Sequence, residues 1–182
     1  MPDPRPAAAA AEIPAEDAAI DPRAFRDAMG RFVTGVTVAT TLDAHDRPVG
    51  VTVNSFTSVS LDPPLILFCL EKKARTRPAF EAAGRFAVNV LSAEQEALSS
   101  RFARAPDDWA EVPVATAETG APVLVDALAA LDCRTEAIHD GGDHIILVGR
   151  VVRLIASDGP GSAPLVYHRG RYSRLAEGPG GR

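Results

Sequence analysis

The sequence contains few residues of the types that form disulfides, metal sites or nucleophilic active sites. Only two of its 182 residues are cysteine, one is tryptophan, and aromatic residues make up 5% of the chain. It has no phosphate-binding Walker loop, no Gly-x-Gly-x-x-Gly sequence, no Cys-x-x-Cys pair and no nucleophile elbow. These absences argue against the nucleotide-binding α/β folds and against an acyl-transfer serine.

Clusters of positive charge are also missing. The formal net charge is −5 and, of the nineteen basic residues, only the adjacent Lys72 and Lys73 are lysines. The arginines are scattered along the chain, so there is no polybasic tract. We therefore expect neither nucleic acid nor an anionic membrane surface to be a partner.

Two further absences concern the cellular compartment. Cys69 and Cys133 both lie in apolar surroundings, where a free thiol behaves as a small hydrophobic side chain. The sequence has no signal peptide and no apolar run long enough to span a bilayer. We expect a soluble cytoplasmic protein.

Four titratable residues surround one expected turn and raise the question of a metal. They are His139, Asp140, Asp143 and His144. Their spacing matches no strong metal-ligand pattern, so we expect no metal and instead a solvated turn with one functional histidine.

The length and the 46% hydrophobic content predict one domain with a proper core. Residues 1–19 contain an alanine run without apolar periodicity, and we expect them to be a disordered tail. The domain is expected over residues 20–176, followed by a flexible Gly/Pro tail over 177–182.

Local patterns predict mostly strands. Asp21 before Pro22 predicts a helix over 22–31, and β-branched residues predict a hairpin of 35–42 with 49–53. The apolar run 65–70 predicts a strand buried on both faces, and Thr76 can cap a short helix that stops at Gly84. The remaining expectations are a strand over 86–91, a helix after a capping box at 92–95, a loop over 106–122, a hairpin of 127–138 with 144–156, and a final segment over 164–175.

Six or more strands arranged as hairpins, with few helices, favour a mainly β fold. We expect a closed antiparallel barrel with helices packed outside.

One stretch, residues 50–64, alternates polar and apolar side chains before a double proline. Period-2 spacing places Thr52 and Asn54 on one face, and Ser58 and Ser60 share a face after a break. No side chain before Asp62 is charged, which suits a neutral polar ligand with a phosphate tail. An edge strand with one wet face is an equally good interpretation.

Several motifs in order resemble the flavin reductase components of two-component monooxygenases. They are Phe32-Val33-Thr34-Gly35-Val36-Thr37-Val38, the 50–64 stretch, residues 84–91, Arg101-Phe102-Ala103, residues 142–151 and Tyr167-His168-Arg169-Gly170-Arg171-Tyr172. The resemblance covers residues 22–175. It implies a split β-barrel that binds FMN or FAD at a homodimer interface, reduces it with NADH or NADPH, and supplies reduced flavin to a separate oxygenase.

The resemblance also implies the site residues. The flavin ring is expected to meet the backbone of residues 36–38 and 53–55, with Phe86 and Ala87 beside it, and the phosphate to meet Lys73, Arg75 and Thr76. Many relatives have serine where this chain has Ala74. The full set of expected flavin-contacting residues is Val36, Thr37, Val38, Val53, Asn54, Ser55, Ser58, Val59, Ser60, Lys73, Arg75, Thr76, Phe86 and Ala87.

His144, Arg171 and Tyr172 are the candidates for the nicotinamide side, with His144 as the catalytic residue. His144 at the mouth of a hairpin has a second interpretation as an exposed turn residue. Trp109 is expected to pack rather than to stack on flavin. Two other functions stay open: a carrier or sensor of the same fold that holds flavin without rapid turnover, and a β-barrel binding protein without flavin.

Overall fold

The computed structural model describes residues 19–156 and 163–175. Of the expected tails, residues 1–19 and 177–182, all but residue 19 lie outside the described residues. The helices are α1 (Pro22–Met29), α2 (Arg77–Ala82) and α3 (Glu96–Arg104), with the 3-10 turn η1 (Ala93–Gln95) before α3. The strands are β1 (Thr34–Gly35), β2 (Thr37–Leu42), β3 (Pro48–Val53), β4 (Thr57–Leu61), β5 (Pro64–Glu71), β6 (Arg85–Val90), β7 (Val114–Thr116), β8 (Pro122–Leu124), β9 (Ala129–Gly141), β10 (His144–Ala156), β11 (Val166–His168) and β12 (Arg171–Ser173).

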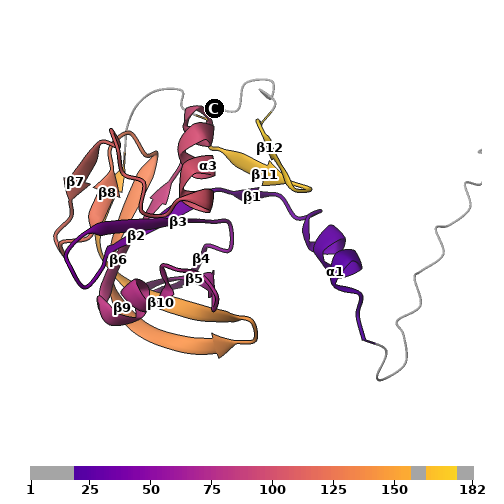
Figure 1. The fold of residues 1–182 in the computed structure, drawn as a ribbon, viewed down its shortest axis with the longest axis horizontal. Coiled ribbons are helices and arrows are strands. Elements are labelled where there is room, and N and C mark those ends of the chain that lie inside the picture. The colour runs from indigo at the N-terminus through magenta and orange to yellow at the C-terminus, as the bar shows by residue number, and fades with distance from the viewer. Residues whose placement is uncertain (1–18, 157–162, 176–182) are drawn as a thin grey trace, which may run out of the picture.

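Seven strands form one antiparallel sheet in the order β3-β2-β6-β9-β10-β5-β4. Its two edge strands, β3 and β4, follow each other in the chain but do not pair, so the curled sheet stays open between them (Figure 1). Smaller sheets are formed by β1-β11-β12 and by β7-β8. The mainly β, split-barrel class is the one that the family resemblance implies, whereas the closed barrel expected from the strand number is wrong, because β3 and β4 do not pair.

The two long hairpins form as predicted. β2 pairs with β3, with Thr37 opposite Val53 and Leu42 opposite Pro48. β9 and β10 pair along most of their length, and their turn is formed by Gly142 and Asp143, where Gly142 has a positive φ that favours glycine.

The core fills the inside of the curled sheet with aromatic rings. Phe68, Phe80 and Phe86 are fully buried and meet edge to face, with the Phe68 ring centroid 5.2 Å from that of Phe86. Gly149 makes room for this packing, because a Cβ atom there would lie 2.4 Å from the Phe86 ring. These contacts fix β6 and β10 against each other.

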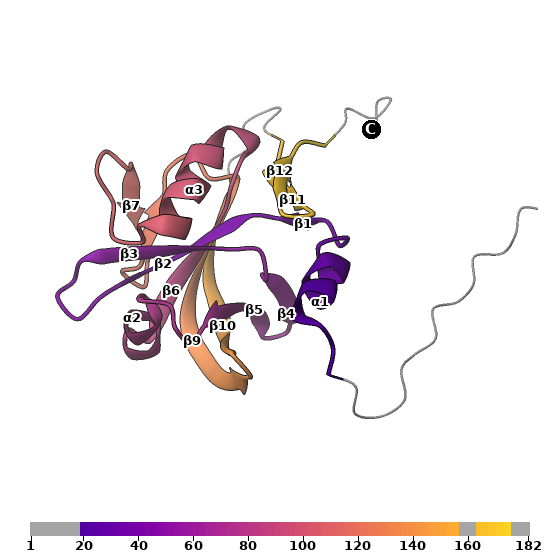
Figure 2. The same cartoon turned by 45° about the vertical axis from the view of Figure 1, so that its right-hand side comes forward.

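The helices lie in different surroundings (Figures 1 and 2). α3 covers the sheet over β3: the Phe102 ring is buried, and Ser99 O accepts a hydrogen bond from Thr52 Oγ1 at 2.7 Å. α1 stands apart from the sheet in the view of Figure 1 and contains no buried residue, although Asp21 caps it as predicted. No described helix has both the length and the hydropathy that a membrane span requires.

Three expectations about local structure are corrected. The segment 106–122 is not all loop, because Val114–Thr116 forms β7 and pairs with β8. β5 is fully buried on one face only, since its residues alternate between buried and half-buried. Thr76 occupies the N-cap position of α2 but its hydroxyl makes no capping hydrogen bond. The capping box of Ser92 and Gln95, by contrast, is present.

Candidate functional site

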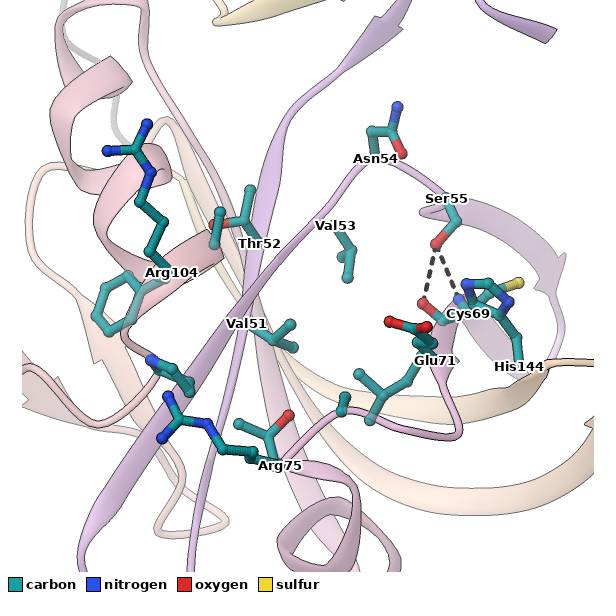
Figure 3. Close-up of a pocket in the computed structure, with 16 residues that line it drawn as sticks. Val51, Thr52, Val53, Asn54, Ser55, Cys69, Glu71, Arg75, Arg104 and His144 are labelled. Atoms are coloured by element: carbon teal, nitrogen blue, oxygen red, sulfur yellow. Dashed lines mark hydrogen bonds between the residues drawn. The ribbon is translucent and has the colours of Figure 1, made fainter. Parts of the chain in front are cut away.

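A cavity of about 410 Å³ lies at the open side of the barrel, between β3 and β5 (Figure 3). β3 contributes its last residues, β5 its C-terminal end, and the segment after β5 leads from there into α2. Its volume falls within the range of about 300 to 1,000 Å³ of small-molecule sites. Six predicted site residues line it: Val53, Asn54, Ser55, Arg75, Thr76 and His144.

One end of the cavity is polar and internally hydrogen-bonded. Ser55 Oγ accepts a hydrogen bond from Cys69 N at 2.9 Å and donates one to Cys69 O at 3.2 Å, which ties the segment after β3 to β5. His144, the first residue of β10, holds its Nδ1 2.7 Å from Asp143 Oδ1. The Glu71 carboxylate also lies at this end, which we call the neutral end because no lysine or arginine side chain lines it (Figure 3).

The contact with His144 affects the acidity of its partner. The hydrogen bond from the imidazole, with the attraction of its positive charge, lowers the pKa of the Asp143 carboxyl. Asp143 therefore stays ionised at neutral pH and holds the imidazole in place as a hydrogen-bond acceptor. An oriented imidazole whose Nε2 is free of this contact can hydrogen-bond to a ligand.

The opposite end, which we call the cationic end, carries the guanidinium groups of Arg75 and Arg104 (Figure 3). Arg75 comes 4.0 Å from Asp107 Oδ1, too far for a strong hydrogen bond. Thr76 is 4% exposed, and its hydroxyl has no hydrogen-bond partner. Loosely paired cations beside an unpaired buried hydroxyl are suited to hold an anion.

An apolar strip separates the two ends. Val51 and Val53 of β3 and Leu70 of β5 form it, and the Phe102 ring, 1% exposed, packs against β3 at Gly50. Gly50 lets that ring approach β3, because a Cβ atom at this position would lie 2.9 Å from it. A flat aromatic ligand can lie against this strip, with its polar edge and any anionic tail at opposite ends of the cavity.

The comparison with protein families agrees with this arrangement. Residues 29–176 match the model of the flavin reductase like domain. The chain belongs to the flavin reductase-like domain family. The resemblance predicted from its motifs is thereby confirmed.

Curated relatives of this flavin reductase-like protein cover most of its length. It is 44% identical over 159 residues to the reductase subunit HsaB of a flavin-dependent monooxygenase from Mycobacterium tuberculosis, covering 87% of this chain and 84% of that one. It is 45% identical over 154 residues to the FMN reductase (NADH) SmoA from Agrobacterium fabrum, covering 85% and 86% of the two chains.

Solved structures show the same fold. Component B of nitrilotriacetate monooxygenase from Mycobacterium thermoresistibile superposes with a TM-score of 0.82 at 39% identity, covering 88% of this chain and 90% of that one. The NADH:FAD oxidoreductase SgcE6 from Streptomyces globisporus gives a TM-score of 0.79 at 38% identity, covering 91% and 99%.

Five of the expected flavin-contacting residues of this flavin reductase-like chain have side chains in the core. Thr37 is buried and donates a hydrogen bond to Val53 O at 3.0 Å. Phe86 and Ala87 are fully buried on β6 and do not line the cavity, so their place beside the flavin stays a prediction. Val36 and Val38 are likewise buried, in the apolar cluster that includes Phe102. β-branched and aromatic side chains of central strands fill the barrel rather than the cavity.

Other expected residues lie outside the cavity for different reasons. β4 is an edge strand, and its residues Ser58 and Val59 are exposed while Ser60 is half-buried, as in the wet-edge interpretation. Lys73 is exposed and does not line the cavity.

On β12, Tyr172 Oη lies 2.8 Å from Ser99 Oγ and Arg171 is exposed, so neither reaches the cavity within this chain. Their contacts with ligands stay predictions.

Sequence reasoning missed several residues that line the cavity. Arg104 is the most important, because it supplies half of the cationic end. The Arg101-Phe102-Ala103 motif lies next to it and was the available clue. Cys69 and Leu70 were missed because the apolar run of residues 65–70 predicted only core positions. Glu71 was missed because it was interpreted as part of the charged turn that follows this run.

The described residues contain no group of three or more His, Cys, Asp or Glu side chains placed to hold a metal ion. Trp109 packs on Phe102, with ring centroids 4.7 Å apart, as expected.

Proposed function

We propose that this chain is a flavin reductase that uses NADH or NADPH to reduce FMN or FAD and releases the reduced flavin to a separate oxygenase. The cavity carries this proposal, because its apolar strip joins a hydrogen-bonding end to a cationic end. Flavin has the matching chemistry: a flat ring with a polar edge, a polyol chain and an anionic tail. The names of the related proteins support the same activity.

The residues at the cationic end fit a flavin phosphate. Arg75 and Arg104 supply charged donors, and the buried Thr76 hydroxyl lacks a partner in the protein. Leaving a buried polar group unpaired costs about 1 to 3 kcal/mol, so a phosphate oxygen that pairs with it stabilises the complex. Ala74 provides no hydroxyl at this end.

At the neutral end, the chain orients the two reactants rather than reacting itself. Hydride passes from the nicotinamide to the flavin, and this chemistry belongs to the two ligands. Ser55 fixes the backbone next to the ring edge, and His144, held by Asp143, is placed to hydrogen-bond the nicotinamide carboxamide or ribose. Asn54 is exposed at the rim, its side chain directed away from Val53 (Figure 3).

Steady-state assays of NADH oxidation with increasing FMN, FAD or riboflavin test the activity directly. We expect saturation by free flavin and many turnovers per protein, since a diffusing product requires an off-rate at least as fast as turnover. Flavin that is reduced once and never exchanges would favour the carrier or sensor function. Absence of any reduction would contradict the proposal.

We also propose a homodimer. Phe25 and Met29 of α1 and the nearby Phe32 are all more than half exposed, and Leu61 on β4 is 95% exposed. Apolar side chains at helical spacing that find no core in their own chain are suited to a second copy, which supplies a matching surface by symmetry.

Light scattering after size exclusion tests the homodimer. The double variant Phe25→Ser, Phe32→Ser should shift the mass from dimer to monomer, whereas Val114→Ser, which removes an exposed apolar residue on β7, should not. A monomeric unmodified protein would refute the dimer.

The cytoplasmic location and the domain limits of residues 20 and 176 are likewise proposals. Cell fractionation tests the first. Limited proteolysis followed by mass spectrometry tests the second, with cleavage expected outside these limits.

A further inference from the structure

Glu71, the last residue of β5, places a carboxylate at the neutral end of the cavity. It is exposed and lines the cavity, and Figure 3 shows it beside the hydrogen-bonded pair of Ser55 and Cys69. Side chains alternate along β5, so Leu70 is buried while Cys69 and Glu71 lie on the opposite face of the strand. Glu71 therefore belongs to the wall of the cavity and not to the core.

Strand pairing puts Glu71 next to His144. β5 and β10 are antiparallel, and the Cα partner of Glu71 is His144, just as that of Cys69 is Ile146. Directly opposite residues of an antiparallel pair have Cβ atoms about 4.5 to 5.5 Å apart on one face of the sheet. The imidazole itself is engaged by Asp143. The carboxylate and the residue proposed for the nicotinamide therefore face the same part of the cavity.

No cation of the chain is paired with the Glu71 carboxylate. Within residues 19–156 and 163–175, no ion pair includes Glu71. Lys72 is paired with Asp140, and Lys73 is exposed and does not line the cavity. The arginines that line the cavity lie at its opposite end (Figure 3). The negative charge of Glu71 is therefore available to a ligand.

Hydride transfer between the two proposed ligands separates charge. The C4–H bond of the dihydronicotinamide breaks, and its hydrogen leaves with both bonding electrons to form an N–H bond at N5 of the flavin. The nicotinamide ring is oxidised and becomes a cation, and the flavin is reduced and becomes an anion. A nearby carboxylate stabilises the ring that becomes positive and destabilises the ring that becomes negative.

We propose that the Glu71 carboxylate faces the nicotinamide ring and stabilises the positive charge that this ring acquires as the hydride leaves. This proposal rests on the proposed function, because it requires the nicotinamide to bind beside His144. A charged group accelerates a reaction when it interacts more strongly with the transition state than with the bound substrate. Glu71 meets this condition, since the dihydronicotinamide ring carries no charge for it to attract.

The test uses Glu71→Gln, which removes the charge and keeps the size of the side chain. Stopped-flow reduction of FMN by the nucleotide that the protein oxidises faster, NADH or NADPH, gives the rate constant of reduction and the dissociation constant of the reduced nucleotide. Product inhibition gives the dissociation constant of the oxidised nucleotide. Glu71→Asp keeps the charge as a first control. The second control, Glu118→Gln, removes a charge from an exposed residue between β7 and β8 that does not line the cavity.

We expect Glu71→Gln to weaken the oxidised nucleotide about fivefold, the scale of two opposite charges about 4 Å apart in water. The rate constant of reduction should fall about threefold, because only part of the charge has developed in the transition state. The dissociation constant of the reduced nucleotide should change less than twofold, because its ring is neutral. Glu71→Asp should keep most of the rate, and Glu118→Gln should behave as the unmodified protein.

Equal weakening of both nucleotide forms would make Glu71 a residue of binding alone and would overturn the proposal, as would unchanged constants. Tighter binding of reduced FMN to Glu71→Gln in an anaerobic titration, with unchanged binding of the oxidised nucleotide, would also overturn it, because the charge would then act on the flavin. Failure of the proposed function has a separate signature. In that case neither nucleotide would reduce flavin with the unmodified protein.

Discussion

The two ends of the cavity differ in how far their polar groups are already satisfied. At the neutral end, Ser55 and His144 have hydrogen-bond partners within the chain. At the cationic end, Thr76 Oγ1 has none and Arg75 has only a distant carboxylate. The first end is arranged before any ligand arrives, whereas the second gains its partners from the ligand.

This difference teaches which part of a ligand each end controls. Groups held by the protein set orientation, because their positions do not depend on binding. Groups that lack partners in the protein contribute to binding affinity. A hydrogen bond from such a group to an anion removes the cost of leaving the buried group unpaired. Substitutions at the two ends should therefore change different measured quantities.

The largest expected effect is at the cationic end. The double variant Arg75→Ala, Arg104→Ala should lose about 2 kcal/mol of FMN binding, roughly thirtyfold in the dissociation constant, because two partly exposed charged donors are removed. Riboflavin, which lacks the phosphate, should bind as before. A titration with equal losses for FMN and riboflavin would place the phosphate elsewhere.

The next effect concerns the link between β3 and β5. Ser55→Ala leaves Cys69 N without its acceptor and should lower the free energy of unfolding by about 1 kcal/mol. Ser58→Ala, on the exposed edge strand, should change it by less than about 0.5 kcal/mol. Urea denaturation of both variants makes the comparison, and similar values would mean that the Ser55 contact does not brace the cavity.

A smaller effect is expected on the nicotinamide side. His144→Ala should raise the Michaelis constant for NADH about fivefold, the scale of one hydrogen bond near 1 kcal/mol, and leave the flavin dissociation constant unchanged. His139→Ala, on the exposed part of β9 away from the cavity, is the control. If stopped-flow reduction by NADH were the same in all three proteins, His144 would be only a solvated turn residue.

The smallest effect is the pH dependence of the His144–Asp143 contact. Because the folded-state pKa of Asp143 lies below its ordinary value of 3.8, its stabilising contribution is present above that value. It is lost as the pH falls through the lowered pKa. Thermal melts of Asp143→Asn and the unmodified protein should differ slightly above pH 3.8 and converge in stronger acid. A difference that grew on acidification would contradict this assignment.

Much of the fold could be predicted from local patterns. A β-branched run before Asp46 predicted the first hairpin, and alternating segments on either side of Gly142 predicted the second. The Ser92–Gln95 capping box marked the start of the segment that contains α3. These features depend on neighbouring residues alone. The short β7–β8 sheet was missed because strands of three residues leave too weak a pattern.

The site was predicted less completely. Ser55, Thr76 and His144 were found because polar side chains stand out next to apolar strands. The contact of Phe86 with flavin stays a prediction, and its ring packs in the core because Phe68 and Gly149 from distant strands meet it there. Arg104 was missed because nothing near it in the sequence shows that α3 ends beside Arg75.

The sequence by itself determined the family, the strand-rich class and the polar residues of the neutral end, because motifs and alternation are local and survive without knowledge of packing. Only the tertiary structure decided that the barrel is open between β3 and β4, and that Arg75 and Arg104 share one end of a cavity. It also decided that Glu71 lies opposite His144 at the other end. These features depend on contacts between residues that are far apart in the chain. The curl of the sheet and the packing of α2 and α3 bring these residues together.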